Sequence, residues 1–204
     1  GLIREQMVYF RQRFDQLGCL LSNIQGIPNY YRQFGYDYAL PLEGGYRLEL
    51  RYVPALQSDK ISLRPASTED IESLSNLYNR SMAELCYKSV RDSSIWRYLL
   101  TRDNPADGMV HDTFIAEDSE EHPLGYMRIP HNHFGDELVI DEAYAQTHDC
   151  AVALLDKAKT LATERDKPGL RLNLPASSHI VRLALANGGM AMGTYAWQIH
   201  VPDM

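Results

Sequence analysis

The segment 26–36, Gly-Ile-Pro-Asn-Tyr-Tyr-Arg-Gln-Phe-Gly-Tyr, constrains the fold most because it holds both a start and a stop signal for a short helix. It follows an apolar stretch, Leu20 to Ile24, that is typical of a strand. Pro28 suits the first helical turn, where its missing N–H costs nothing. Gly35 suits the left-handed position just past a helix end. We therefore predict a strand, one or two helical turns and a second strand beginning at Tyr36.

A longer helix is predicted upstream, over residues 2–17. Its apolar residues recur at three- and four-residue spacings, which gives the helix one apolar face: Ile3, Met7, Phe10, Phe14 and Leu17. Gly18 is the expected end of this helix. Taken alone, the pattern is that of an ordinary amphipathic helix.

The chain divides at residues 53–60, where Val-Pro-Ala-Leu-Gln-Ser-Asp-Lys breaks the strand pattern and is typical of a linker. Before it, we expect two strands, 36–42 and 46–53, joined by a hairpin-type turn at 43–45. After it, the predicted order is strand, two helices, three strands, helix, strand, helix, strand. The predicted ranges are 61–64, 69–82, 93–101, 112–117, 124–129, 137–143, a helix with Val152, Leu155, Ala158, Leu161 and Ala162 on one face, and then 170–174, 180–186 and 194–201. The overall class is α+β.

Composition excludes several classes of protein. The length of 204 residues fits one or two domains, and the net charge of −7 argues against a nucleic-acid partner. No apolar stretch approaches the ~18 residues of a membrane span. Neither the cysteines nor the histidines have the spacing of a metal site or a disulfide framework: Cys19, Cys86, Cys150, His131 and His133 with Asp136. We expect reduced thiols, no metal and a cytoplasmic protein.

The first segment resembles the GNAT superfamily of acyl-CoA-dependent N-acetyltransferases, in which a tyrosine stands four residues before a Gly-aromatic pair. Tyr31 stands four residues before Gly35-Tyr36. The resemblance implies that Tyr31 is the general acid that protonates the departing coenzyme A thiolate. The choice of Tyr31 over its neighbour Tyr30 rests on the family's spacing.

The same resemblance implies an acetyl-CoA site at the start of the first helix. In the family, a Gln/Arg-x-x-Gly-x-Gly/Ala loop opens such a helix, and its backbone N–H groups bind the cofactor pyrophosphate. Gly1 corresponds to the middle glycine and Ile3 to the last position, so the implied cofactor-binding residues are Gly1, Leu2, Ile3 and Arg4. The first half of the motif would then precede residue 1. Arg4 is equally compatible with a solvent-exposed position.

The element order extends the resemblance to the whole chain. Residues 1–52 are similar to the C-terminal part of one GNAT unit and residues 61–204 to a complete second unit, with 53–60 as linker. This plan resembles the tandem enhanced intracellular survival acetyltransferases. A segment as short as 1–52 buries little surface and would expose a strand edge, so we expect it to dock on the second unit, to pair with another chain or to be unstable.

The second unit departs from the family's motifs. The stretch 146–151, Gln-Thr-His-Asp-Cys-Ala, fits Gln-x-x-Gly-x-Ala except that Asp149 replaces glycine. A carboxylate there would repel a pyrophosphate, and Asp149 also suits a helix N-cap. Leu185 occupies the position of the family's tyrosine and cannot act as an acid. Glu142 is either a general base near a strand end or a solvated strand residue. The second unit is therefore predicted to be non-catalytic.

The sequence predicts an N-acetyltransferase that transfers an acetyl group from acetyl-CoA to a small-molecule or peptide amine, with this chain an incomplete part of it. The parent protein is expected to be a homo-oligomer without membrane or nucleic-acid partners. The alternative is a non-catalytic GNAT-fold module for binding or assembly. An unrelated α+β fold is the third possibility, if the Tyr31 spacing is accidental.

Overall fold

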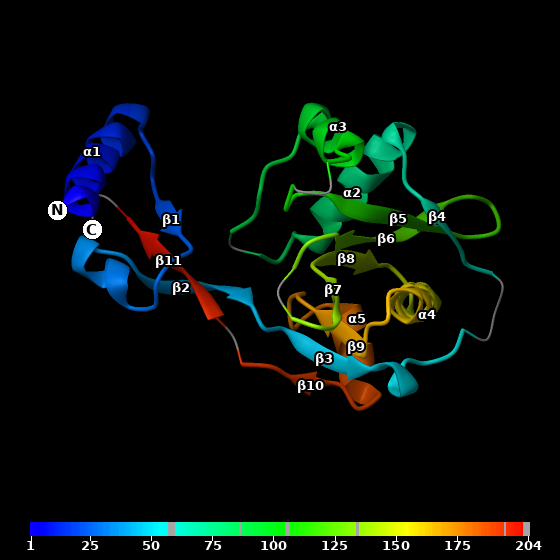
Figure 1. The fold of residues 1–204 in the computed structure, drawn as a ribbon. Helices are drawn as coiled ribbons and strands as arrows, with labels where there is room; N and C mark the ends of the chain where they lie inside the picture. The colour runs from blue at the N-terminus through cyan, green and yellow to red at the C-terminus, as the bar shows by residue number, and fades with distance from the viewer. Residues whose placement is uncertain (57–59, 86, 105–106, 134, 194, 202–204) are drawn as a thin grey trace. The chain divides into compact units, whose positions relative to one another are not determined.

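The computed structural model describes residues 1–56, 60–85, 87–104, 107–133, 135–193 and 195–201. They form two compact units, and each is described by itself (Figure 1). Unit 1 combines Gly1–Gly44 with Gly193–Met204, and unit 2 is Gly45–Met192. Three of the predictions fall partly outside the described residues: the middle of the linker at 57–59, Cys86, and Thr194 at the start of the last strand.

Unit 1 contains one α-helix, one 3-10 helix and a three-stranded antiparallel sheet. These elements are α1 (Leu2–Leu17), β1 (Ser22–Ile24), η1 (Tyr30–Phe34), β2 (Asp37–Glu43) and β11 (Tyr195–His200). The strand order is β1-β11-β2, so the C-terminal strand lies between two strands from the N-terminal segment. Gln198 at its centre stands opposite Ile24 on one side and Tyr38 on the other.

The local signals of unit 1 act largely as predicted. Helix α1 begins at Leu2 and ends before Gly18. Helix η1 ends before Gly35, whose φ of 81° is the left-handed conformation that glycine adopts without strain. One detail is wrong: Pro28 lies in a turn before η1, because Asn29 with φ 61° separates it from the first helical residue.

The sequence predicts an exposed strand edge in the first segment, and in the structure β11 pairs with two strands of that segment, β1 and β2. Both β1 and β2 bond to β11 and not to each other. The predicted hairpin at 43–45 is also wrong, since β2 pairs with β11 whereas β3 (Tyr46–Glu49) pairs with strands of unit 2. Gly44 and Gly45 therefore link strands of two different sheets.

Unit 2 contains the remaining elements, in two four-stranded sheets. They are β3 (Tyr46–Glu49), η2 (Leu50–Tyr52), β4 (Ser62–Pro65), η3 (Thr68–Asp70), α2 (Ile71–Ser81), α3 (Ser93–Thr101), β5 (His111–Glu117), β6 (Pro123–Pro130), β7 (Leu138–Ile140), β8 (Glu142–Ala145), α4 (His148–Glu164), β9 (Gly169–Leu172), α5 (His179–Ala186) and β10 (Met190–Ala191). The strand orders are β10-β3-β9-β7 and β4-β5-β6-β8.

A single predicted strand over 137–143 is two strands in the structure. Strand β7 runs parallel to β9, and β8 runs antiparallel to β6, with Asp141 between them. The chain therefore passes from one sheet to the other at Asp141. This break positions the cleft described below.

Helices cover both faces of the β4-β5-β6-β8 sheet (Figure 1). Alternate residues of β6 show this, because side chains along a strand point to opposite faces. Tyr126 packs with residues of α2 and α3, such as Leu74 and Trp96. Met127 belongs to the larger cluster that includes Leu154 and other residues of α4. Unit 1 has a small core of its own around Met7, Phe34 and Tyr36.

A capping box fixes the start of η3, which leads directly into α2. The Ser67 hydroxyl accepts a hydrogen bond from the Glu69 N–H, and the Asp70 carboxylate accepts one from the Ser67 N–H at 2.7 Å. Arg64 forms ion pairs with Asp70 at 2.7 Å and with Glu117 at 2.6 Å. The hydrogen bond from Arg64 is the main cause that lowers the pKa of Asp70.

The predicted fold class agrees with the structure: a mixed sheet system is flanked by helices. The compact units do not coincide with the predicted segments, since β3 lies in unit 2 and β11 in unit 1. Residues 1–52 and 61–204 as two successive GNAT units thus stay a prediction.

Candidate functional site

A cleft of about 350 Å³ lies in unit 2. Its lining residues come from the end of α2 and the loop after it, from β8, and from the segment that leads into α5. They are Arg80, Ser81, Met82, Ala83, Glu84, Asp141, Glu142, Ala143, Tyr144, Ala145, Gln146, Leu174, Pro175, Ser177, Ser178, His179 and Arg182.

The cleft forms because two neighbouring strands part. The parallel pairing of β7 with β9 ends at Ile140 and Leu172, followed by one bond from the Asn173 N–H to the Ile140 carbonyl. Beyond Asp141, β8 bonds to β6 and is the edge strand of its sheet. An edge strand presents N–H and C=O groups to whatever lies beside it. The cleft wall therefore offers backbone groups that an amide-containing ligand can bind.

Glu142 lies on this wall, but it is neither solvated nor free. Its carboxylate accepts two hydrogen bonds from Arg91, at 2.8 and 2.6 Å, and one from the Tyr126 hydroxyl at 3.2 Å. Arg128 stands 3.8 Å away. Although burial acts to lower the pKa of Arg91, the bonds to Glu142 raise it overall. Glu142 is thus one half of a buried ion pair, and the prediction of a solvated strand residue is wrong.

Helix α4 begins beside the cleft, and its cap differs from the prediction. The N-cap is Thr147, whose hydroxyl accepts from the Cys150 N–H at 3.2 Å. Asp149 is therefore not the cap; it lies exposed in the first turn of α4. Because a carboxylate in that turn competes with any anion for the helix N-terminus, the position disfavours a pyrophosphate.

Leu185 lies near the end of α5, and its side chain is 42% exposed. An aliphatic side chain supplies no proton, so this position in unit 2 offers no general acid.

Tyr31, the predicted acid, lies in η1 of unit 1 within an aromatic cluster. Its ring meets those of Tyr30, Phe34 and Tyr36 at centroid distances of 5.1, 6.4 and 6.4 Å. A Cβ on Gly26 would lie 2.2 Å from the Tyr31 ring, so the absence of a side chain at Gly26 leaves room for that ring. Tyr31 is only partly buried, as an acid that meets a substrate needs to be.

The predicted cofactor residues form the exposed start of α1. Gly1 is the N-cap, and its carbonyl accepts from the N–H groups of Arg4 at 2.9 Å and Glu5 at 3.3 Å. Arg4 also donates to the Gln33 side chain at 3.2 Å. Because Gln33 lies in η1, this bond ties the first turn of α1 to the helix that carries Tyr31.

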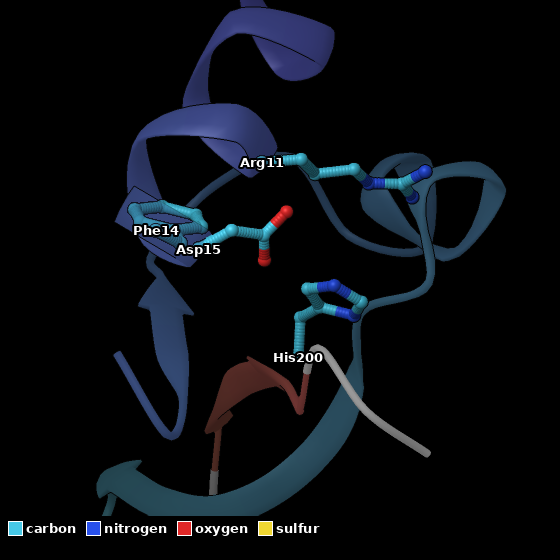
Figure 2. Close-up of a pocket in the computed structure, with 4 residues that line it drawn as sticks. All are labelled: Arg11, Phe14, Asp15 and His200. Atoms are coloured by element: carbon cyan, nitrogen blue, oxygen red, sulfur yellow. The ribbon is translucent and has the colours of Figure 1, made fainter. Parts of the chain in front are cut away.

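A smaller pocket of about 170 Å³ in unit 1 contains residues that sequence reasoning missed. Figure 2 shows the Asp15 carboxylate pointing into the space between Arg11 and His200. Arg11 donates to the Phe34 carbonyl at 2.5 Å, and the His200 Nδ1 lies 3.1 Å from the Gly35 carbonyl oxygen. Both side chains thus satisfy carbonyls at the end of η1. No local signal could have found His200, since it comes from the opposite end of the chain.

Among the described residues, no group of His, Cys, Asp and Glu side chains is arranged to hold a metal ion. His131 bonds instead to Asp112 at 2.8 Å. Within the same residues, no helix has the length and apolar character needed to span a membrane.

Comparisons with known proteins find relatives at the level of structure alone. No protein-family model and no curated protein matches the sequence. The chain is similar to a conserved protein of unknown function from Enterococcus faecalis, described as a probable N-acyltransferase. That similarity has a TM-score of 0.70 and 15% identity, and it covers 98% of this chain and 50% of the other.

Two further structures are named N-acetyltransferase or Eis1. A GCN5-related N-acetyltransferase from Anabaena variabilis matches with a TM-score of 0.64 and 14% identity, over 96% of this chain and 49% of that one. Eis1 from Mycobacterium abscessus matches with a TM-score of 0.55 and 16% identity, over 100% of this chain and 52% of that one. The chain therefore has the α+β fold of these N-acetyltransferase structures and spans about half their length.

Proposed function

We propose that this chain is part of an acyl-CoA-dependent N-acetyltransferase that transfers an acetyl group from acetyl-CoA to an amine. The observation that supports it is the fold, a mixed sheet system flanked by helices, which is shared with N-acetyltransferase structures.

In this proposal, the acid and the pyrophosphate-binding residues both lie in unit 1. The first N–H groups of α1 have no intrahelical partner and suit a phosphate. Gly1, Leu2, Ile3 and Arg4 would bind the pyrophosphate of acetyl-CoA, with the Arg4 guanidinium adding a positive charge.

Bound acetyl-CoA supplies an activated acetyl thioester. A neutral amine attacks its carbonyl carbon, and a strand N–H stabilises the oxyanion that develops. As the carbon–sulfur bond breaks, Tyr31 donates its proton to the thiolate, and the proton that the attacking nitrogen loses returns to the Tyr31 phenolate through solvent.

Residues 1–52 and 61–204 would be a partial first unit and a complete second unit of a tandem protein similar to the enhanced intracellular survival acetyltransferases. Residues 61–204 would not catalyse transfer, since Leu185 offers no proton and Asp149 opposes a pyrophosphate. We further propose a small-molecule or peptide amine as acceptor, a homo-oligomeric protein in the cytoplasm, and no nucleic-acid partner, in keeping with the net charge of −7.

The test is the rate of coenzyme A release from acetyl-CoA with a panel of amines, for wild type and Tyr31→Phe. Tyr30→Phe is the matched control, because it removes the same atom from the adjacent ring. The proposal predicts that Tyr31→Phe lowers kcat by about 10²-fold or more, leaves KM for acetyl-CoA nearly unchanged, and that the control keeps wild-type kcat. Equal kcat in all three proteins would remove Tyr31 from this role.

A further inference from the structure

Two arginines that line the cleft in unit 2 form no ion pair with any described side chain. Arg80 donates to the Gln146 amide oxygen at 3.2 Å, which is a neutral partner. Arg182 lines the cleft from α5 and forms no ion pair with a described residue. Two arginine side chains thus face one concavity without a carboxylate partner.

The carboxylates of the cleft lie elsewhere on its lining. Glu142 is occupied by Arg91, and Asp141 is hydrogen-bonded to His111 at 2.8 Å. Both stand at the break between β7 and β8. Glu84, in the loop after α2, is the one cleft carboxylate without an ion pair among the described residues.

The α5 wall, by contrast, has donors and no acid. It is formed by Ser177, Ser178, His179 and Arg182. Ser178 stands at the N-cap position of α5, yet its side chain makes no capping hydrogen bond. Its hydroxyl is therefore available to a ligand, beside an arginine and a histidine.

Apolar side chains complete the lining. Met82, Ala143, Ala145, Leu174 and Pro175 give the cleft an apolar portion next to the charged wall. The volume of about 350 Å³ falls at the lower end of the range for small-molecule sites.

We propose that this cleft binds a small ligand bearing a phosphate or carboxylate group, held by Arg182 and Arg80 with help from Ser178 and His179. Arginine suits either anion because its guanidinium donates two parallel hydrogen bonds. The apolar portion of the cleft would hold the rest of the ligand. Unit 2 would then be a ligand-binding module, whether or not Tyr31 takes part in acetyl transfer.

The experiment is a titration of the ¹⁵N-labelled chain followed by amide chemical shifts. Sodium phosphate, sodium acetate and coenzyme A are the three probes. The variants are Arg182→Gln and Arg80→Gln, and Arg97→Gln is the matched control, since Arg97 is exposed on α3 and does not line the cleft. The readout needs no turnover, so it stays informative if the proposed activity fails.

At least one anion should shift the amides of Ser178, His179 and Arg182 saturably. Arg182→Gln should weaken that affinity at least about tenfold, and Arg97→Gln should leave it unchanged. A preference for phosphate or for acetate identifies the anion. Tighter binding of coenzyme A at the same amides would assign the phosphate to a nucleotide.

The proposal is overturned if no probe gives saturable shifts at these amides up to about 50 mM. It is equally overturned if Arg182→Gln and Arg97→Gln weaken binding by the same factor, since binding would then follow net charge alone. Far-UV circular dichroism of each variant shows that the fold is retained.

Discussion

Replacing Glu142 by glutamine should destabilise unit 2 strongly, although the two side chains have nearly the same shape. The Arg91 and Glu142 side chains are 14% and 9% exposed, and their two hydrogen bonds measure 2.8 and 2.6 Å. The Arg91 guanidinium also lies 4.2 Å from the ring centroid of Tyr78. Losing the carboxylate charge would leave this buried cation without its counter-ion.

The expected loss follows from that burial. Breaking a buried ion pair from one side costs about 3–5 kcal/mol, whereas an exposed pair is worth about 0–1 kcal/mol. Arg128 adds to the cost, because its Nε and Nη2 are already buried without hydrogen-bond partners, and its nearest anion is Glu142 at 3.8 Å. We expect Glu142→Gln to lower the free energy of unfolding by about 3–4 kcal/mol.

Urea denaturation, followed by the fluorescence of the fully buried Trp96, measures this loss. Trp197→Phe in both proteins confines the signal to unit 2. With slopes of about 1–3 kcal/mol/M, the midpoint should fall by at least about 1 M urea. Glu120→Gln is the control, since Glu120 is 77% exposed in the turn between β5 and β6. A loss below about 1 kcal/mol for Glu142→Gln, similar to that of the control, would refute the reasoning.

Three further predictions concern single positions. Gly45 has φ +66°, and an added Cβ would lie 2.1 Å from the last carbonyl oxygen of β9. Gly45→Ala should therefore lower the free energy of unfolding, measured in urea, by about 2–4 kcal/mol. Gly108→Ala, where the space is open, should change that free energy little. Asp70→Asn should lower the free energy of unfolding by about 1–2 kcal/mol at neutral pH. Because the pKa of Asp70 in the folded protein lies below the ordinary 3.8, the difference in stability from wild type should shrink as pH falls below about 4. A difference that does not change with pH would contradict this. Burial raises the pKa of the Cys150 thiol to about 12, so Cys150 should react slowly with an alkylating reagent. Peptide mapping after brief alkylation of the native protein should find Cys19 modified and Cys150 intact. Equal modification of the two cysteines would show that Cys150 is accessible.

The features that the sequence predicts well depend on interactions between residues that are close together along the chain. The apolar spacing of α1 and the glycines after α1 and η1 act through neighbours three to four residues away, so their positions were predictable. The capping box at Ser67 is of the same kind, because it needs only four consecutive residues. The prediction of Asp149 as the cap of α4 failed because Thr147, two residues earlier, is also a residue type that caps helices well.

The larger errors concern partners that are distant in sequence. Alternation identifies a strand but does not say which strand it bonds to, so the place of β11 between β1 and β2 could not be read from residues 195–200. The burial of Glu142 depends on Arg91, 51 residues away. Its neighbour Asp141, where the chain changes sheet, is a residue type that favours turns, but a single Asp without a neighbouring Gly, Pro, Asn or Ser did not mark the break.

Strand β11 comes from the C-terminal end of the chain but lies between β1 and β2, and this pairing affects the position of Tyr31. His200 of β11 and Arg11 of α1 both bond to carbonyls at the end of η1, the helix that carries Tyr31. Since β11 is also the central strand of unit 1, the position of Tyr31 depends on the last described residues of the chain.

The central claim is that the protein uses acetyl-CoA, and calorimetric titration with acetyl-CoA tests it most directly. The account predicts saturable binding to one site, with a dissociation constant between about 1 μM and 1 mM, and an unchanged constant in Tyr31→Phe, because the acid acts in the transition state. The absence of saturable heat from a protein that circular dichroism shows to be folded would contradict the account.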